Sequence, residues 1–559
     1  MRRALWLSAL LAATACKRVD SAEVGKKILH FGVRSEVASL DPVHASDEAS
    51  SIAQGLVYEP LLQYDYEARP LVLRPLLLAA MPEVSEDLRT YTFTLRDDVR
   101  FSDHDAFAEG VGRTVTSTDV VYSFKRMADA KNAPKGWWIF AERIVGFDDY
   151  KEAQNAAPSF DYDAPVKGFE IHDTRRFSIH LTNPYPQLLY ILAMAYTAVV
   201  PREVVEHAGE AFPRLAIGSG PFRLNRWAPG VELDFTRRPS RHDKVALDGV
   251  CLHIFPQEQP MWLKWRVRDL DVIIVPFDYQ PALFDRDKGL REAFVEDGVS
   301  MYQYDKLDFV FRGFNMEDPI VGGFERGKLV RKALAAAYDV DEIGRAFYDG
   351  AITAYAGPIP PGLAGHDDAL REPYRGPNLA LAKKLLAEAG YPGGRGLPPI
   401  ELNFYRGGSS PEQAEMIRRQ WSKIGVEVDV KLFSFPELSR RIRDKKAQVF
   451  SLAWGSDYPD AENNLAMFYG PNAAPGSNHF NYRRDAYDRL YERARVMPPS
   501  DERTSLYTRM RDLVIADAPF MGAFARQRYY AQNRRVSRFV PNETWWTWLK
   551  YVDVEPRTR

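Results

Sequence analysis

Short runs of alternating apolar and polar residues dominate the chain from residue 27 to about residue 300. Examples are "YTFTLRDDVRF", "FEIHDTRRFSIHL", "VELDFTRR" and "VCLHIF", which are rich in β-branched and aromatic residues. A period of two with this composition is typical of strands buried on one face. Helical patterns lie between these runs, in "STDVVYSFKRM", with Ser117 or Thr118 as the expected N-cap, and in "PREVVEHAGE". This part of the chain therefore predicts a mixed α and β structure.

From about residue 310 the helical and strand patterns alternate regularly. "GKLVRKALAAAYD" has helical apolar spacing, Asn378 begins a helix that Gly390 ends, and Ser410 begins a helix that Gly425 ends. Strand patterns follow in "IELNFY", "VEVDVKLF" and "QVFSLAW", with a helix "FPELSRRIRDKK" before the last of them. Connections of a few residues in the order α-β-α-β-α-β indicate parallel strands covered by helices. Two amphipathic helices, "DAYDRLYERARV" and "DERTSLYTRMRDLVIADAP", come later.

Asp457 follows the strand pattern "QVFSLAW" directly, in "GSDYPDAENNL". Ligands of open α/β sheets bind outside the carboxyl ends of the strands, so this is the position of a binding residue. The residue type alone leaves four roles open: a turn residue, a metal ligand, a catalytic acid, or the counter-ion of a bound ligand. Asp460 is expected to cap the helix "AENNLAMFY", because a carboxylate suits the positive end of a helix dipole.

The composition is that of an ordinary globular protein. The 559 residues are 45% hydrophobic and 27% charged, with a formal net charge of -2. No large basic surface is expected, so nucleic acid is not a predicted partner. After Cys16 no stretch has 18 consecutive apolar residues, and we expect the mature protein to lie outside the membrane core.

The N-terminus "MRRALWLSALLAATAC" has the pattern of a secretory signal, with two arginines, a short apolar run and small residues before Cys16. We predict a signal peptide over 1–15 and a lipid-anchored linker over 16–26, with Cys16 carrying the lipid. The alternative is an ordinary signal peptide cleaved near Ala15, which would release a soluble periplasmic protein. Either way the protein is expected in the cell envelope, facing the periplasm. The other cysteine, Cys251, is expected to be a small buried hydrophobic residue.

Familiar catalytic and metal-binding motifs are absent from the sequence. It contains no G-x-S-x-G, H-E-x-x-H, C-x-x-C, Walker A or G-x-G-x-x-G pattern. "FSDHDAF" around His104 is the most metal-like segment, although a solvated turn is the favoured interpretation. We predict no catalytic residue, no metal, no cofactor and no enzyme. A hydrolase that uses dispersed carboxylates remains an alternative that the sequence leaves open.

A series of segments along nearly the whole mature chain is similar to those of one transport family. They are "SLDPVHASDEASSIAQGLVYEPLLQYD", "AAMPEVSEDLRTYTFTLRDDVRFSD", "GSGPFRLNRWAPGVELDFTR", "FRGFNMEDP" with "VRKALAAAYDVDEI", "AKKLLAEAGYPGG" and "GSDYPDAENNLAMFYG". Each segment is modest evidence, but their common order is specific. The chain resembles family 5 solute-binding proteins of ABC importers, the group that binds dipeptides and oligopeptides.

The resemblance implies an α/β fold of the periplasmic binding protein type, class II. Two lobes would close over a ligand in the cleft between them, and an additional α+β domain would be attached. Lobe I would comprise 27–58, 203–304 and 532–559, the additional domain 59–202, and lobe II 305–531. Two crossing strands, near "DFVFRGFN" and "FARQRYYAQN", would form the hinge.

The resemblance also implies a ligand site and a function. Asp457 matches the aspartate that pairs with the α-amino group of a bound peptide, and Trp454, Gly455, Ser456 and Tyr458 would line the same cleft. The strand before Asp457 contains no basic residue, so Arg406 is the candidate for a peptide carboxylate. We expect a monomer that captures peptides and delivers them to a transmembrane permease. Because "RRPSRHD" and "SDHDAFAEGVGRT" depart from the family pattern, a nickel chelate, haem, an oligosaccharide or another small amine remains an alternative ligand.

Overall fold

The computed structural model describes residues 23–44, 46–238, 242, 244–285, 289–541 and 546–558. The predicted signal peptide, Cys16 and the first part of the predicted linker lie outside the described residues. No helix in the described part of the chain combines the length and the apolar character needed to span a membrane.

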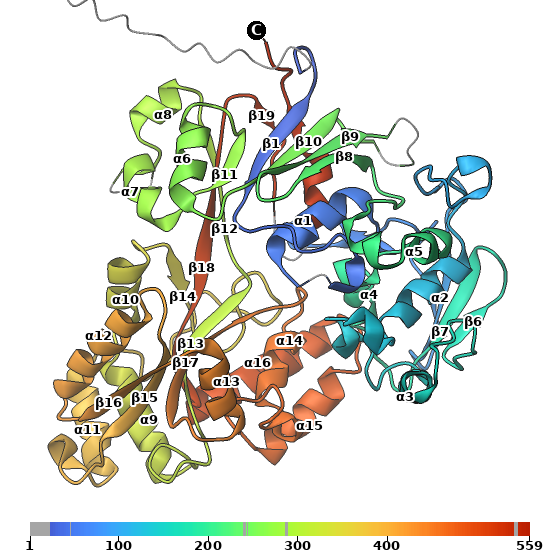
Figure 1. Ribbon diagram of the computed structural model, residues 1–559. Coiled ribbons are helices and arrows are strands. Elements are labelled where there is room, and N and C mark those ends of the chain that lie inside the picture. Colours follow the sequence, from blue (N-terminus) through green and yellow to red (C-terminus); the bar gives the residue numbers. More distant parts are fainter. Residues whose placement is uncertain are drawn as a thin grey trace, which may run out of the picture.

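One large mixed sheet forms the framework of the molecule (Figure 1). Within the described ranges it has twelve strands, ten of them in the order β16-β15-β17-β13-β18-β11-β1-β10-β9-β8, while β12 and β14 pair with β18. Its strands are β1 (Ile28–Val33), β8 (Phe222–Ala228), β9 (Glu232–Arg237), β10 (Gly249–Ile254), β11 (Val272–Ile274), β12 (Ser300–Asp305), β13 (Asp308–Phe314), β14 (Ile352–Ala354), β15 (Ile400–Tyr405), β16 (Val428–Phe433), β17 (Val449–Gly455) and β18 (Phe520–Gln532).

Two neighbouring strand paths connect the halves of this sheet. The first half of β18 pairs with β13 and β14, and its second half, from Gln527 to Gln532, pairs with β12 and β11. The second path runs from β12 through Lys306 and Leu307 into β13. The molecule is therefore two-lobed, with the first lobe around β1 and the second around β15, and β18 is the long red strand between them in Figure 1. The crossing of β18 lies near Gln527, a few residues before the predicted boundary at 531; the other domain boundaries stay predictions.

The second lobe has the parallel α/β arrangement that the pattern predicts. β15 pairs in parallel with both β16 and β17, and helices cover the faces of these strands. The Asn378 side chain accepts a hydrogen bond from the Leu381 main chain and caps the first crossover helix. Gly390 and Gly425 end helices with φ of +87° and +80°, where other residues would be strained. The helices are α9 (Arg326–Ala337), α10 (Val340–Phe347), α11 (Leu379–Glu388), α12 (Ser410–Ser422), α13 (Phe435–Arg443), α14 (Glu462–Leu465), α15 (Asp485–Ala494) and α16 (Asp501–Asp517).

The first lobe and a side region, here the elements from β2 to α5, share one hydrophobic core. The side region contains an antiparallel sheet in the order β4-β5-β7-β6. Its α2 is capped by Thr116 in a capping box with Asp119, which corrects the predicted N-cap at Ser117 or Thr118. The remaining elements are α1 (Glu48–Val57), β2 (Leu62–Tyr64), β3 (Leu73–Pro75), β4 (Glu83–Val84), β5 (Thr90–Thr94), α2 (Ser117–Arg126), α3 (Phe147–Ala156), β6 (Phe169–Ile171), β7 (Arg176–His180), α4 (Leu188–Ile191), α5 (Arg202–Ala208), α6 (Glu258–Arg266), α7 (Gln280–Leu283), α8 (Glu292–Glu296), β19 (Val536–Ser537) and β20 (Asp553–Val554).

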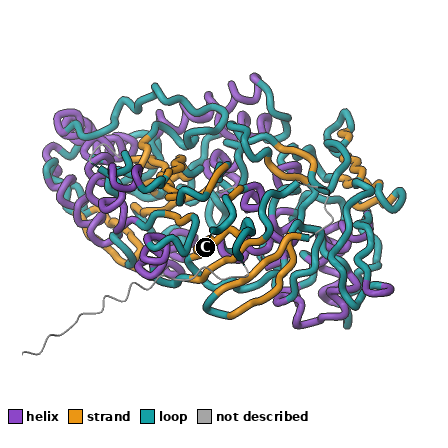
Figure 2. Tube along the Cα trace, turned by 90° about the horizontal axis from the view of Figure 1, so that it is seen from above, coloured by secondary structure: helices purple, strands orange, loops and turns teal. Residues whose placement is uncertain are grey.

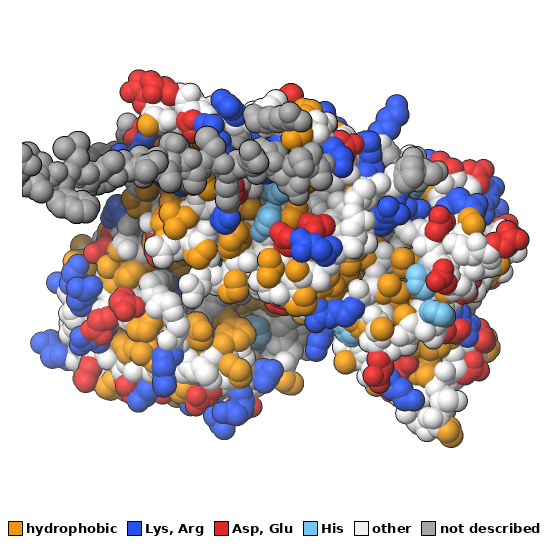
Figure 3. Space-filling view, turned by 45° about the horizontal axis from the view of Figure 1, so that its top comes forward, with side chains coloured by type: hydrophobic (Ala, Val, Ile, Leu, Met, Phe, Trp, Pro, Cys, Tyr) orange, Lys and Arg blue, Asp and Glu red, His pale blue; other side chains and the backbone are white. Residues whose placement is uncertain are grey.

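Seen from above, strands run through the interior and helices gather around them at one end of the molecule (Figure 2). On the face shown in Figure 3, basic and acidic side chains are interspersed with apolar ones. The mixture of charges on this face agrees with the near-zero net charge.

Candidate functional site

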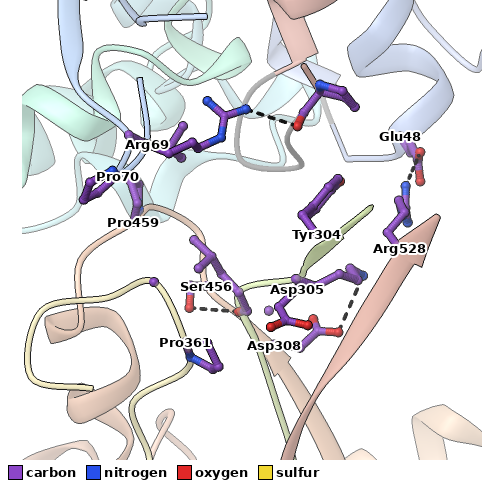
Figure 4. A pocket seen from close by; sticks show the side chains of 16 residues that line it. Glu48, Arg69, Pro70, Tyr304, Asp305, Asp308, Pro361, Ser456, Pro459 and Arg528 are labelled. Carbon is purple, nitrogen blue, oxygen red and sulfur yellow. Dashed lines mark hydrogen bonds and ion pairs between the residues drawn. The ribbon is translucent and has the colours of Figure 1, made fainter. Parts of the chain in front are cut away.

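A cavity of about 660 Å³ lies where the two strand paths cross between the lobes (Figure 4). Its walls come from the start of α1, the side region, the β12–β13 connection, the carboxyl end of β17 and the second half of β18. The volume lies within the range of about 300–1,000 Å³ that is typical of small-ligand sites. The lining residues are Glu48, Arg69, Pro70, Leu71, Tyr304, Asp305, Lys306, Leu307, Asp308, Pro361, Gly362, Gly455, Ser456, Pro459, Arg528 and Pro541.

The cavity wall carries charges of both signs, and several are held in ion pairs. Arg528 Nη1 lies 3.0 Å from Glu48 Oε1. Asp308 is buried and accepts a 2.6 Å hydrogen bond from Arg526 Nε, with Lys306 Nζ 3.7 Å away. Figure 4 shows Arg528 on β18 beside Glu48, and Asp305 and Asp308 at the β12–β13 connection. The hinge strands therefore supply charged groups directly to the cavity.

Asp305 and Arg69 are the cavity charges whose described contacts go to neutral partners. Asp305 Oδ1 accepts a 2.7 Å hydrogen bond from the Thr353 hydroxyl. The exposed Arg69 donates to the main-chain carbonyls of Tyr66, Ala68, Val540 and Pro541 at 2.9–3.3 Å. Each side chain keeps a net charge for a ligand group of opposite sign.

Asp457 lies just beyond the carboxyl end of β17, as the pattern predicts. Its Oδ2 accepts a 3.0 Å hydrogen bond from Asn463 Nδ2, and its main-chain N–H donates to Asn463 Oδ1 at 3.2 Å. The side chain reaches solvent, but the surrounding protein desolvates it and raises its pKa, an effect that the Asn463 hydrogen bond opposes. Asp457 is not among the described residues that line the 660 Å³ cavity, although Ser456 and Pro459 on either side are.

The other residues predicted around Asp457 have different surroundings. Gly455 and Ser456 line the cavity, and the Ser456 hydroxyl donates to the Leu307 carbonyl at 3.1 Å. Trp454 is half-buried, and its Nε1 donates to Asn463 Oδ1 at 2.8 Å. Tyr458 is buried, and its hydroxyl donates to Glu462 at 2.7 Å. Trp454 and Tyr458 thus support the loop that carries Asp457, and neither is among the described residues that line the cavity.

Asp460 anchors this loop from inside the protein. Its Oδ1 accepts a 3.0 Å hydrogen bond from the Glu462 main chain at the start of α14. The N-cap of this helix is Ala461, one residue after the predicted cap at Asp460. The same carboxylate accepts from Arg503 Nη1 at 2.7 Å and from the Tyr507 hydroxyl at 2.8 Å. Asp460 and Arg503 are both buried, so this pair fixes the loop to α16.

Arg406 stands at the carboxyl end of β15 and is exposed. Its guanidinium donates to the Leu432 carbonyl of the edge strand β16 at 2.9 Å. Arg406 is absent from the described lining of the cavity, and its role toward a carboxylate stays a prediction.

The pattern analysis missed the charged residues Glu48, Arg69, Asp305, Lys306, Asp308 and Arg528, which line the cavity. One signal was available: "YDKLD" places three charges between two strand patterns, at the predicted crossing. By contrast, the turn favoured around His104 is confirmed, since Asp103 Oδ1 accepts from the Gly112 main chain at 2.9 Å and His104 Nδ1 accepts from Ala106 at 3.1 Å.

The geometry of a cavity between hinged lobes agrees with a comparison to known families. The family model described as "Bacterial extracellular solute-binding proteins, family 5 Middle" matches residues 72–476. The chain belongs to this family. The resemblance and the two-lobed fold predicted from the sequence are thereby confirmed.

Relatives in this family differ in their named ligands. The chain is 25% identical over 453 residues to a dipeptide-binding protein of Escherichia coli, covering 79% of both chains. It is also 25% identical over 481 residues to heme-binding protein A of Haemophilus influenzae, covering 83% of this chain and 81% of that one. Among solved structures, HbpA2 of Haemophilus parasuis superposes with a TM-score of 0.78 at 23% identity, covering 94% of this chain and all of that one. That likeness concerns the fold alone.

Proposed function

We propose that this protein is the extracytoplasmic binding protein of an ABC importer, which captures peptides between its lobes and delivers them to a transmembrane permease. The observation that carries the proposal is the cavity at the hinge with charges of both signs, in a member of this family. A short peptide is a zwitterion, and such a wall offers partners to both of its ends.

The amino end of the peptide is assigned to Asp457. Its raised pKa reflects an anion that is poorly solvated and therefore gains from a cationic partner. Asp305 is the competing candidate, because its carboxylate lies in the cavity wall itself. Asp305 ends β12 and Asp457 follows β17, so substituting each residue separately distinguishes the two assignments.

The carboxyl end of the peptide is assigned to Arg69. Its side chain lines the cavity, and its described hydrogen bonds go to neutral carbonyls. A guanidinium can grip a carboxylate with two parallel hydrogen bonds. Arg406 remains the alternative donor for this end.

Calorimetric titration with a tripeptide and its N-acetylated and C-amidated forms tests both assignments. Asp457→Asn should weaken binding of the free tripeptide by about 2–5 kcal/mol and abolish the preference over the acetylated form. Arg69→Ala should remove the preference over the amidated form. Asp429→Asn, at an exposed ion pair with Lys431 on β16, is the matched control and should bind normally.

Two results of these titrations would contradict the assignment of the amine to Asp457 or the peptide proposal itself. If Asp305→Asn removes amine selectivity and Asp457→Asn leaves it intact, the amine is held in the cavity wall. If no peptide of two to five residues binds the wild-type protein, the peptide proposal fails. Haem is then the next ligand to test, by a shift of its absorption on mixing, because one relative is a heme-binding protein.

Attachment to the membrane through Cys16 is a separate proposal that rests on the sequence "ATAC". Cys16→Ser should move the protein from the membrane fraction to the soluble envelope fraction. Unchanged fractionation with an unmodified N-terminal peptide by mass spectrometry would favour ordinary cleavage near Ala15.

A further inference from the structure

A second group of reactive side chains lies in the first lobe, on β1, β10 and β9. In the register of these strands, Cys251 of β10 pairs with His30 of β1 on one side and with Asp234 of β9 on the other. Two residues further along β10, His253 pairs with Glu232 of β9. Alternation explains the placement: Leu29, Phe31 and Val33 enter the core, so His30 faces the other side of the sheet. One ligand atom each of His30, Cys251 and His253 lies within 4.8 Å of the others.

The two histidines point nitrogen to nitrogen. His30 Nδ1 and His253 Nε2 are 3.0 Å apart. The outer nitrogen of each ring faces a carboxylate: His30 Nε2 lies 3.2 Å from Glu23 Oε2, and His253 Nδ1 lies 3.2 Å from Glu232 Oε2. When each carboxylate accepts the N–H of its neutral imidazole, the two inner nitrogens present lone pairs to each other. A metal ion between the rings, or a proton shared by them, then makes the contact favourable.

Cys251 completes the group from the same face. Its Sγ lies 3.6 Å from Glu232 Oε2, and a second set of ligand atoms within 4.8 Å comprises Cys251, Glu232 and Asp234. Carboxylates behind metal-binding histidines are the usual outer partners, since they fix the ring and its tautomer. In this structure each ring has such a carboxylate partner, Glu23 for His30 and Glu232 for His253.

We propose that His30, His253 and Cys251 bind a transition-metal cation of the zinc class, with Glu232 and Glu23 orienting the two rings. Two imidazoles and a thiolate suit zinc and its neighbours, whereas calcium and magnesium need oxygen ligands. Imidazole nitrogens on tetrahedral zinc lie about 3.3 Å apart, so the 3.0 Å separation needs only a small adjustment of the rings. Water would supply the fourth ligand.

The site is reachable from solvent, and neighbouring arginines neutralise part of its acidic charge. His30 is only 7% exposed, while His253 and Glu232 are about one-fifth exposed, which leaves a path from solvent. Arg226 pairs with Glu232 and Asp234, and Arg557 lies 3.5 Å from Glu23. These two arginines balance part of the acidic charge, so the group does not depend on a metal to offset three bare carboxylates.

This site is independent of the proposed peptide site. None of its residues is among those described as lining the 660 Å³ cavity. It joins β1, near the beginning of the described chain, to β10 and β9, more than 200 residues later. A metal bound there would link β1 to β10 in the first lobe. It would stabilise the folded protein because it binds only that state, and it would not contact the peptide.

Calorimetric titration of the chelator-treated mature chain with Zn²⁺ at pH 7.5 tests the proposal. One equivalent should bind and raise the melting temperature. Co²⁺ at the same site should give a thiolate-to-cobalt charge-transfer band, which only a sulfur ligand produces. Cys251→Ser should abolish that band, and Glu232→Gln should weaken Zn²⁺ binding about 10–100-fold.

Peptide titration and circular dichroism show whether each variant is folded. His104→Asn is the matched control: its ring lies 5.6 Å from that of His207, another histidine pair, and the variant should bind Zn²⁺ normally. Equal Zn²⁺ binding by the wild-type, Cys251→Ser and His30→Asn proteins overturns the proposal. So does a wild-type protein that shows pH-dependent stability but no stoichiometric metal, since a shared proton would then be the cation between the rings.

Discussion

At the scale of single residues, the loop that presents Asp457 is held by buried charges beneath it. Asp460 and Arg503 are 5% and 3% exposed, and the Asp460 carboxylate also binds Tyr507 and the start of α14. The loop conformation therefore depends on a pair of charges that solvent does not reach.

We expect Arg503→Ala to lower the free energy of unfolding by about 3–5 kcal/mol, because Asp460 would be left as an uncompensated buried charge. Urea denaturation measures this loss. Arg493→Ala is the control, since its pair with Glu502 is more than half exposed and should contribute about 0–1 kcal/mol. Equal losses in the two variants would mean that Asp460 finds another partner.

The raised pKa of Asp457 predicts how peptide binding depends on pH. Desolvation makes ionised Asp457 less stable than an ordinary aspartate, so on acidification it takes up a proton at a higher pH. Affinity for a free amine should be full above this pKa and fall as the pH drops through it, beginning above the ordinary value of about 3.9. Calorimetry between pH 7 and 4 measures the profile, and Asp457→Asn should flatten it. A wild-type profile as flat as that of the variant would remove Asp457 from the amine site.

At the scale of elements, the second lobe was the most predictable part of the fold. Asn378, Gly390 and Gly425 mark helix ends by local chemistry, so α11 and α12 were found from the pattern alone. The N-cap of α2 is Thr116, one residue before the predicted Ser117, and Asp119 completes a capping box with it. The metal-binding candidates were missed because Cys251 and His253 form only a C-x-H pattern, and their partner His30 reaches them through a strand pairing between distant segments.

Gly522 allows β18 to pass Tyr338 at an irregular point of the pairing between β13 and β18. It has φ of +63°, and an added Cβ would lie 2.1 Å from Tyr338 Cε1. We expect Gly522→Ala to lower the free energy of unfolding by about 2–4 kcal/mol, because backbone strain and the clash with Tyr338 add together. Thermal unfolding measures the change.

The control for Gly522 is Gly323→Ala, which has φ of +70° but no atom within 4 Å of the added Cβ. It should show only the strain, about 1–2 kcal/mol. If both variants lose the same stability, Tyr338 moves aside freely and the close approach in β18 is not a constraint.

At the scale of the whole molecule, the two lobes could be predicted from the sequence, but the residues that line the cavity between them could not. Motif order along the chain identified the family, and the predicted crossing segments are found in β13 and β18. The cavity, however, brings together residues as distant as Glu48, Asp305 and Arg528. No local sequence pattern predicts that these residues lie together, because their proximity depends on how the side region packs against both lobes.

An aromatic contact between the side region and the second lobe can be used to test whether the lobes close on peptide binding. Tyr190 of α4 and Tyr458, beside Asp457, stack with ring centroids 5.8 Å apart and planes within 2°. If peptide binding favours the closed arrangement, this stack forms part of the bound state. We expect Tyr190→Ala to weaken peptide binding by about 0.5–1.5 kcal/mol, or roughly 2- to 13-fold, because an aromatic pair is lost only from the closed form.

Tyr405→Ala removes an aromatic contact with Phe435 inside the second lobe and should leave peptide affinity unchanged. Small-angle scattering supplies the structural readout: saturating peptide should reduce the radius of gyration of the wild-type protein, and at a hundredfold excess over Kd it should add about 2.7 kcal/mol of stability. Stabilisation without compaction would show that the ligand binds lobes that are already closed. In that case Tyr190→Ala should open the free protein, and the radius of gyration of the unliganded variant would exceed that of the wild type.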